Sequence, residues 1–402
     1  MTQSSLPQSI PVVRLNPKAN ARAVRHGFPW VFSDEIVTDR RTKAIVAGSI
    51  ARLEDSDRRA LGLVAVNMAS KISCRMLDRN VDQQIDENWF KDRFTAALKH
   101  RETMFDAPFY RLVHAEADGL PGVIIDRFGD AAVIQPNAAW ADVMLEPMIN
   151  ALMAVTGVST VIKNAAGRSR VLEGLNEETC LIKGQLDGPI AVPMNGATYM
   201  ADLLGGQKTG LFYDQRPNQA FCQKLVKNAR VLDVFSHVGG FSLAALAAGA
   251  TSAVAVDSSA PALELARGGA AEMGCADKFE TRKGDAFVVL EQLAEEGKTF
   301  DVVICDPPAF APNKQSLKAG LRAYERVARL AAPLVAKGGY LGLCSCSHAA
   351  DIEGFRNSSA RGMGRAGRRS AQIYSGSAGA DHPVLPQLAQ NGYLKSLFFR
   401  LD

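Results

Sequence analysis

Short apolar runs alternate with longer amphipathic segments from about residue 205 to the end of the chain. The runs have the length of strands, and they are VLDVFS, SAVAVD, FETRK, FDVVICD and YLGLCS. Strands separated by helices predict a parallel, doubly wound sheet. Ligands bind to such sheets at the carboxyl ends of the strands, near the point where the strand order reverses. We therefore expect an α/β domain over residues 205–402, with a long helix reaching Ala336 before the last of these strands.

The first half of the chain has a different pattern. Residues 11–80 contain short runs of strand length, VVRL, WVFSDEI, GSIARLED, LGLVAVN and SKISCRML, and helical spacing is scarce there. This pattern predicts a small β-barrel-like domain. Residues 85–190 begin with apolar side chains at helical spacing, which we interpret as the core face of a helix over residues 86–104. Strands and a helix near residues 140–155 follow, so we expect an α+β middle domain over 85–190.

Composition limits the class of protein. The chain has 402 residues, of which 47% are hydrophobic and 22% charged, as in ordinary globular proteins of two or three domains. The most hydrophobic stretch, residues 239–256, is flanked by Asp233 and Asp257, and we interpret it as a helix followed by a buried strand. No signal peptide is apparent, and the seven cysteines have no disulfide-framework spacing. We therefore expect a cytoplasmic protein that does not enter a membrane.

Positive charge is concentrated in two segments. Residues 11–80 hold 13 Lys and Arg against 7 Asp and Glu, although the whole chain has a net charge of only +4. The segment 355–370 has five arginines, among them Arg361 and Arg365, and no acid. Both segments suggest contact with a polyanion, and phosphates in the case of Arg361 and Arg365. The alternative is that both are solvated surfaces.

Four acidic residues come at or just after the ends of successive predicted strands: Asp233, Asp257, Asp285 and Asp306. In such a sheet an acid at the second strand end accepts hydrogen bonds from ribose hydroxyls, and one after the third can accept from the amine of adenine. Each acid alone could be a helix cap. Together they indicate a ligand that contains adenosine.

These features resemble those of S-adenosylmethionine-dependent methyltransferases with a Rossmann-like sheet. The motifs are similar, in order, to those of bacterial large-subunit (23S) ribosomal RNA cytosine-C5 methyltransferases with an N-terminal PUA domain. They are RLNPKANARAVRHGFPWVFSDEI, EADGLPGVIIDRFGD, KTGLFYDQRPNQ, DVFSHVGGFSLAALAAGA, CDPPAF, SCS, DHPV and YLKSLFFRL. One departure is His237, where the family usually has a larger aromatic residue. The resemblance implies a PUA domain over residues 11–80 and ribosomal RNA as partner, and leaves open whether the protein is a homodimer.

The resemblance also implies which residues bind the cofactor S-adenosylmethionine. Asp257 would hold the ribose and Asp285 the adenine, and Thr209 and Gln215 would close over the cofactor. The alternative for Thr209 and Gln215 is that they only organise the linker between domains. The complete set of expected cofactor contacts is Thr209, Gln215, Asp233, Phe235, Gly239, Phe241, Asp257, Asp285, Asp306 and Pro307.

Methylation of cytosine C5 requires a nucleophile, because this carbon is unreactive until a thiolate adds to C6. Cys346 ends the fifth strand in the SCS motif of the family and is the expected nucleophile, and Asp306 is the expected acid at the adjacent strand end. We expect a helix beginning near Ala349 to lower the pKa of the Cys346 thiol. Cys344 lies deeper in the strand, and we interpret it, like Cys305, as a core residue.

Other interpretations remain open at this stage. Phe310 follows Asp-Pro-Pro-Ala and could stack on a flipped base, as in methyltransferases that modify nitrogen atoms. Methylation of a ring or exocyclic nitrogen is therefore one alternative, and an inactive RNA-binding assembly factor is another. Ala309 occupies the position where two-cysteine RNA methyltransferases have a second cysteine, so the base that removes the C5 proton is not identified. A metal site at Cys344, Cys346 and His348 is disfavoured, since structural zinc prefers four ligands.

Overall fold

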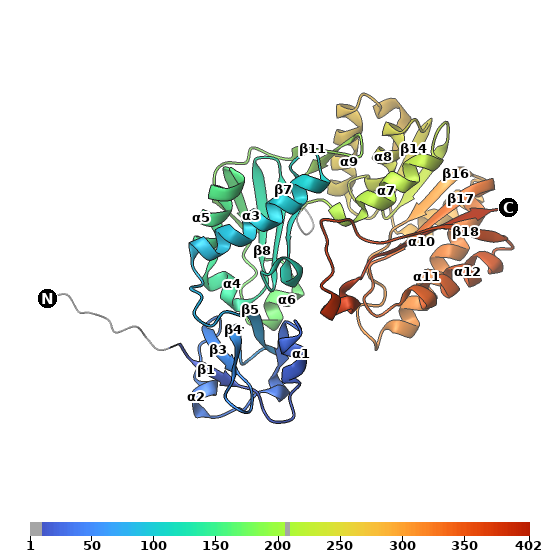
Figure 1. Cartoon of the computed structure of the whole chain (residues 1–402). Coiled ribbons are helices and arrows are strands. Elements are labelled where there is room, and N and C mark those ends of the chain that lie inside the picture. The colour runs from blue at the N-terminus through green and yellow to red at the C-terminus, as the bar shows by residue number, and fades with distance from the viewer. Residues whose placement is uncertain (1–9, 206–209) are drawn as a thin grey trace. The chain divides into compact units, whose positions relative to one another are not determined.

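The computed structural model describes residues 10–205 and 210–402, with the backbone alone for residues 389–391. Contacts divide the chain into two units (Figure 1). The first runs to Leu186 and includes Pro383–Ala389, and the second contains Asp187–His382 and Gln390–Asp402. The first unit thus covers residues 11–80 and all but the last four residues of the segment 85–190. Their proposed limits, 11–80, 85–190 and 205–402, remain a prediction.

The N-terminal sheet of the first unit has five strands in the order β1-β3-β4-β5-β2. β1 pairs with β3 in parallel, and the other pairs are antiparallel. Apolar side chains from these strands, such as Val13, Leu53 and Val64, form its core. All five strands expected in residues 11–80 are present. The elements are β1 (Val12–Arg14), α1 (Ala21–Arg25), β2 (Trp30–Phe32), α2 (Arg40–Lys43), β3 (Ile50–Glu54), β4 (Ala60–Val66) and β5 (Ile72–Asp78).

A second five-stranded sheet in this unit has the order β10-β9-β8-β7-β6. Its main helices pack through aromatic residues: Phe90 in α3 stacks on Trp140 in α4 with ring centroids 6.0 Å apart. Trp89, Phe90 and Phe94 are at most 1% exposed, so their interpretation as a core face is confirmed. The elements are α3 (Glu87–Met104), β6 (Phe109–His114), β7 (Val123–Phe128), β8 (Ala131–Pro136), α4 (Ala139–Val143), α5 (Leu145–Thr156), β9 (Thr160–Lys163), α6 (Arg168–Leu172) and β10 (Cys180–Lys183).

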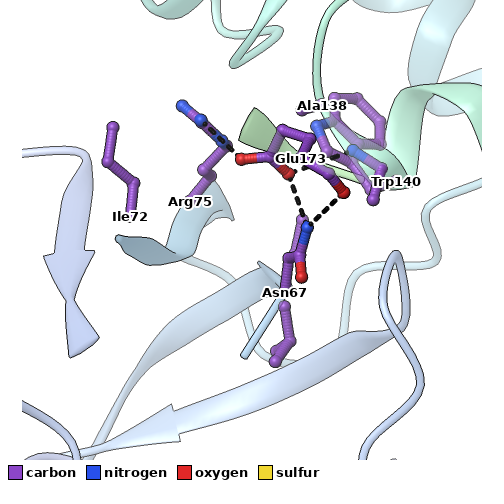
Figure 2. Close-up of a pocket in the computed structure, with 9 residues that line it drawn as sticks. Asn67, Ile72, Arg75, Ala138, Trp140 and Glu173 are labelled. Carbon is purple, nitrogen blue, oxygen red and sulfur yellow. Dashed lines mark hydrogen bonds and ion pairs between the residues drawn. The ribbon is translucent and has the colours of Figure 1, made fainter. Parts of the chain in front are cut away.

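One buried carboxylate links the two sheets of the first unit (Figure 2). Glu173, which ends α6, accepts hydrogen bonds from Asn67 Nδ2 at 2.9 Å, Ser70 Oγ at 2.7 Å and Arg75 Nη2 at 3.1 Å. Burial alone would raise the pKa of Glu173, but these hydrogen bonds and the charge of Arg75 outweigh it, so the pKa lies below its ordinary value. The hollow at this point, lined also by Trp140, is therefore built around a structural ion pair.

The second unit is built on a seven-stranded sheet in the order β15-β14-β13-β16-β17-β19-β18. The first five strands in this order are parallel, and β19 is antiparallel to both its neighbours. The strand order reverses between β13 and β16, which is where such sheets bind ligands. The strands are β13 (Arg230–Val234), β14 (Ser252–Asp257), β15 (Phe279–Lys283), β16 (Phe300–Cys305), β17 (Val335–Ser345), β18 (Ser370–Gly376) and β19 (Lys395–Leu401), and a separate hairpin comprises β11 (Ile190–Met194) and β12 (Ala197–Ala201).

Helices cover both faces of this sheet, with α7, α8 and α9 on one side and α10, α11 and α12 on the other (Figure 1). This arrangement confirms the predicted α/β class. The helices are α7 (Arg216–Cys222), α8 (Gly240–Ala247), α9 (Ala260–Glu272), α10 (Ala286–Glu295), α11 (Leu317–Ala331) and α12 (Ile352–Arg365). Within residues 10–205 and 210–402, no helix combines the length and apolar character that crossing a membrane requires.

Two expected helix limits are wrong. The helix expected to reach Ala336 ends at Ala331, because Pro333 lies in a short 3-10 turn and β17 already begins at Val335. The helix expected to begin near Ala349 begins at Ile352. Asp351 caps it by accepting a hydrogen bond from Gly354 N at 2.7 Å.

Candidate active site

Asp233 stabilises the turn between β13 and α8 through hydrogen bonds to the backbone at the start of α8. This side chain is 1% exposed, and its Oδ2 accepts hydrogen bonds from Phe241 N at 3.1 Å and Ser242 N at 2.8 Å. Burial raises the pKa of the carboxyl to about 6, although the two amides favour the ionised form. The turn is tightly wound, since Phe235 and Gly239 both have positive φ, 63° and 83°. Asp233 therefore fixes the loop that we expect to face the cofactor, and Phe241 is buried beneath it.

Asp257 and Asp285 lie at the ends of the next two strands. Asp257 Oδ2 accepts a hydrogen bond from His237 N at 2.8 Å, which ties the end of β14 to the same turn. Asp285 is exposed and caps α10, with Oδ1 accepting from Phe287 N at 2.9 Å and Val288 N at 3.2 Å. The structure thus brings three acids to one edge of the sheet. Helix capping accounts for part of the role of Asp285, and its contact with adenine remains a prediction.

Asp306 follows β16 and is oriented by Gln215. The Gln215 amide donates from Nε2 to Asp306 Oδ2 at 2.9 Å, and its own Oε1 accepts from Asn218 Nδ2 at 2.7 Å. Gln215 and Asn218 are 4% and 0% exposed, so this chain of hydrogen bonds is shielded from solvent. Gln215 was expected to close over the cofactor, and the structure places it against the expected catalytic acid. Thr209 lies outside the described residues.

Cys346 comes directly after β17 and lies against the segment that follows β16. Its Sγ is 3.9 Å from Pro307 O, so the two strand ends bring the cysteine beside the carbonyl group of the residue that follows Asp306. The cysteine is partly buried, whereas Cys344 and Cys305 are 1% and 0% exposed. Burial raises the pKa of both latter thiols, so neither readily forms a thiolate. Among these three cysteines, Cys346 is the one that is not fully buried, and its role as nucleophile remains a prediction.

The serines on either side of Cys346 anchor it to helix α11. Ser345 Oγ donates to the hydroxyl of Tyr324 at 2.9 Å, and the same hydroxyl lies 2.7 Å from Ser347 Oγ. Ser347 Oγ also accepts from Ala311 N at 2.9 Å. Both serines are fully buried. This role of the SCS motif was not predicted, because nothing in the sequence pairs Tyr324 with the motif.

The expected substrate-binding residues have packing and ionic partners within the second unit. Phe310 lies in an aromatic cluster, with its ring centroid 5.0 Å from that of Tyr324 and 6.2 Å from that of Phe287. Arg361 and Arg365 in α12 both form ion pairs with Glu325 in α11. Their charges are therefore partly balanced, and their role in binding RNA remains a prediction.

The strand ends also hold buried polar atoms that a ligand could engage. In the part of the chain that the structure describes, Asp233 Oδ1 and Ser236 Oγ are buried and lack a hydrogen-bond partner. Buried polar groups are normally satisfied, so such atoms beside the glycine turn fit a site for a polar ligand. Among the same described residues, no group of three or more His, Cys, Asp or Glu could hold a metal ion.

Comparisons with known proteins agree with this geometry. Residues 13–79 match the PUA-like domain model, and residues 160–400 match the model of S-adenosylmethionine-dependent methyltransferases. The chain is 34% identical over 394 residues to ribosomal RNA large subunit methyltransferase I of Shewanella amazonensis, which covers 97% of this chain and 99% of the relative. The chain belongs to the ribosomal RNA large subunit methyltransferase I family. The Escherichia coli O139:H28 member is 32% identical over 391 residues, 96% of this chain and 98% of its own.

Solved structures show the same fold. An S-adenosylmethionine-dependent methyltransferase candidate from Streptococcus mutans superposes with a TM-score of 0.80 at 18% identity, over 97% of this chain and 100% of its own. A methyltransferase candidate solved in complex with SAH has a TM-score of 0.81 at 19% identity, with the same coverage. The predicted family, fold class and cofactor, S-adenosylmethionine, are thus confirmed.

Proposed function

We propose that the protein methylates C5 of a cytosine in large-subunit ribosomal RNA through a covalent bond between Cys346 and C6 of the base. The observation that supports this most strongly is the placement of Cys346. It is the partly buried cysteine at the end of β17, held by two buried serines and packed against the segment after Asp306. The names of the full-length relatives support ribosomal RNA as the substrate.

Cys346, Asp306 and Gln215 have separate roles in the proposed reaction. The Cys346 thiolate adds to C6, the Sγ–C6 bond forms, and the electrons of the C5–C6 double bond move toward C5, the atom that receives the methyl group. Asp306 stabilises a proton or hydrogen bond at N3 of the base, and Gln215 orients its carboxylate. After methylation, loss of the C5 proton re-forms the double bond and expels the thiolate. The base that takes this proton is not assigned.

S-adenosylmethionine, when bound, supplies a methyl group carried on a positively charged sulfur. We assign its binding to the turn of Phe235 and Gly239, to Asp257 and Asp285 at the adjacent strand ends, and to the region of Pro307. The buried polar atoms beneath this turn support the assignment. Asp233 and Phe241 contribute indirectly to cofactor binding, because both are buried and stabilise the conformation of this turn.

RNA binding is assigned to the basic PUA domain, residues 11–80, with Phe310, Arg361 and Arg365 as contacts nearer the methylated base. We further propose that the protein acts in the cytoplasm. We also propose that the protein can form a homodimer, and sedimentation at micromolar concentration tests this proposal.

The direct test is to identify the methylated nucleoside. Unmodified large-subunit ribosomal RNA is incubated with the protein and labelled S-adenosylmethionine, digested to nucleosides and separated. We expect 5-methylcytidine from the wild type and from Cys344→Ser, and none from Cys346→Ser. Label in a nitrogen-methylated nucleoside, or undiminished 5-methylcytidine from Cys346→Ser, would overturn the proposal.

A further inference from the structure

A buried lysine contacts the backbone one residue after Cys346, and none of the proposed catalytic steps uses it. Lys395 is the first residue of β19 and pairs in register with Ser345 of β17. It is 7% exposed, and its Nζ donates a hydrogen bond to Ser347 O at 2.6 Å. Lysine is rarely buried to this degree unless its charge is paired. The ammonium group is thus held at the backbone one residue beyond Cys346.

Two features near Cys346 do not favour its ionisation. The helix that was expected to favour a thiolate begins only at Ile352, and its N-terminus is already capped by the carboxylate of Asp351. Asp306 ends the neighbouring strand and is a further acidic residue at this edge of the sheet. A like charge raises the pKa of a thiol, and a cation lowers it. A cation close to Cys346 would therefore favour its thiolate.

Lys395 is electrostatically coupled to this cysteine. Burial lowers the pKa of Lys395, and the negative charges of Cys346 and Asp351 oppose that shift. Three more titratable groups besides Asp306 lie near the pair. Burial and, to a smaller extent, the charge of Cys346 raise the pKa of Tyr324 in α11. The other two are His348 and Tyr393, whose ring centroids lie 5.5 Å apart. Lys395 is the buried ammonium group at this strand end, held by the carbonyl oxygen of Ser347.

We propose that Lys395 is the positioning residue that keeps Cys346 ionised: its buried ammonium group stabilises the thiolate and, through Ser347 O, fixes the turn that carries the sulfur. The thiol proton passes to solvent, and Lys395 stays protonated when Cys346 bonds to C6 and when it leaves. This inference rests on Cys346 being the nucleophile of the proposed function, and it names the group that activates it.

The test measures the ionisation of Cys346 without RNA or cofactor. The full chain is alkylated with iodoacetamide from pH 5 to pH 10, and the rate at Cys346 is followed by mass spectrometry of its peptide. In the wild type we expect the midpoint well below 8.5, the ordinary value for a free cysteine. Lys395→Met should raise the midpoint by roughly one to two pH units with the high-pH rate unchanged, which lowers alkylation at pH 7 by a factor of about 3 to about 80.

Two comparison variants separate charge from structure. Lys395→Arg should keep the midpoint within about half a pH unit, and Lys337→Met, at an exposed position of the same strand β17, should change nothing. A wild-type midpoint at or above 8.5 would overturn the proposal even if Lys395→Met failed to fold. So would a Lys395→Met protein with the wild-type midpoint and only a lower plateau rate. Failure of the proposed function would appear elsewhere, as methylation retained by Cys346→Ser.

Discussion

Removing one hydroxyl from Tyr324 tests whether the buried network around Cys346 supports the second unit. Tyr324→Phe removes two hydrogen bonds, to Ser345 Oγ and Ser347 Oγ, and introduces no new atom. Each buried hydrogen bond contributes about 1 kcal/mol, and a buried hydroxyl left without an acceptor costs about 1–3 kcal/mol. Ser347 Oγ keeps Ala311 N as a donor, whereas the Ser345 hydroxyl loses the acceptor to which it donates. We expect a loss of about 2–3 kcal/mol in the free energy of unfolding.

Thermal unfolding followed by calorimetry measures this loss. For a unit of about 200 residues, 2–3 kcal/mol corresponds to a fall in Tm of roughly 5–10 °C. Tyr340→Phe is the matched control, because Tyr340 lies in β17 and its hydroxyl makes no hydrogen bond to the described residues, so its effect should stay within about 0.5 kcal/mol. Equal Tm values for the two variants would refute the hydroxyl network as a source of stability.

Three further substitutions test other parts of the structure. Glu173→Gln should lower the free energy of unfolding of the first unit by about 3 kcal/mol at pH 7, as measured by urea unfolding. The control Glu177→Gln, at an exposed position, should lower it by less than about 0.5 kcal/mol. Because the pKa of Glu173 is lowered in the fold, its contribution is present above its unfolded pKa and is lost as pH falls through the folded value, so the Gln variant should lose less stability in acid. Gln215→Leu should lower single-turnover methylation roughly tenfold to a hundredfold with RNA affinity unchanged, because Asp306 loses a charge-assisted hydrogen bond; an unchanged rate contradicts this role. Asp233→Asn should flatten the fall in stability between pH 3.8 and about 6, since the raised pKa means that the folded protein holds this proton to a higher pH than the unfolded chain does; a wild-type pH profile would exclude this explanation.

Most of the fold of the second unit could be predicted from the sequence. The apolar strands are separated by helices, and that pattern alone specifies a parallel sheet with its site at one edge. The two errors both concern where a helix begins or ends. Pro333 stops α11 early, and Asp351 starts α12 late, because local capping outweighs the apolar pattern near helix ends.

The candidate site was predictable only where its residues follow strands directly. Asp306 and Cys346 could be placed beside one another because they end neighbouring strands. The partners of these residues could not be found in this way. Gln215 is separated from Asp306 by 91 positions and Lys395 from Ser347 by 48, and these pairs meet only after the sheet has formed. Tertiary pairing of this kind leaves no periodic signal in the sequence.

The proposed mechanism requires Cys346 to bond covalently to the base. This bond can be trapped by incubating the protein and S-adenosylmethionine with large-subunit ribosomal RNA that contains 5-fluorocytosine, whose C5 fluorine cannot leave as a proton does. The wild type and Cys344→Ser should form a protein–RNA adduct that survives denaturation, with the nucleotide attached to the peptide of Cys346. An adduct formed equally by Cys346→Ser, or attached to another cysteine, would show that Cys346 is not the nucleophile.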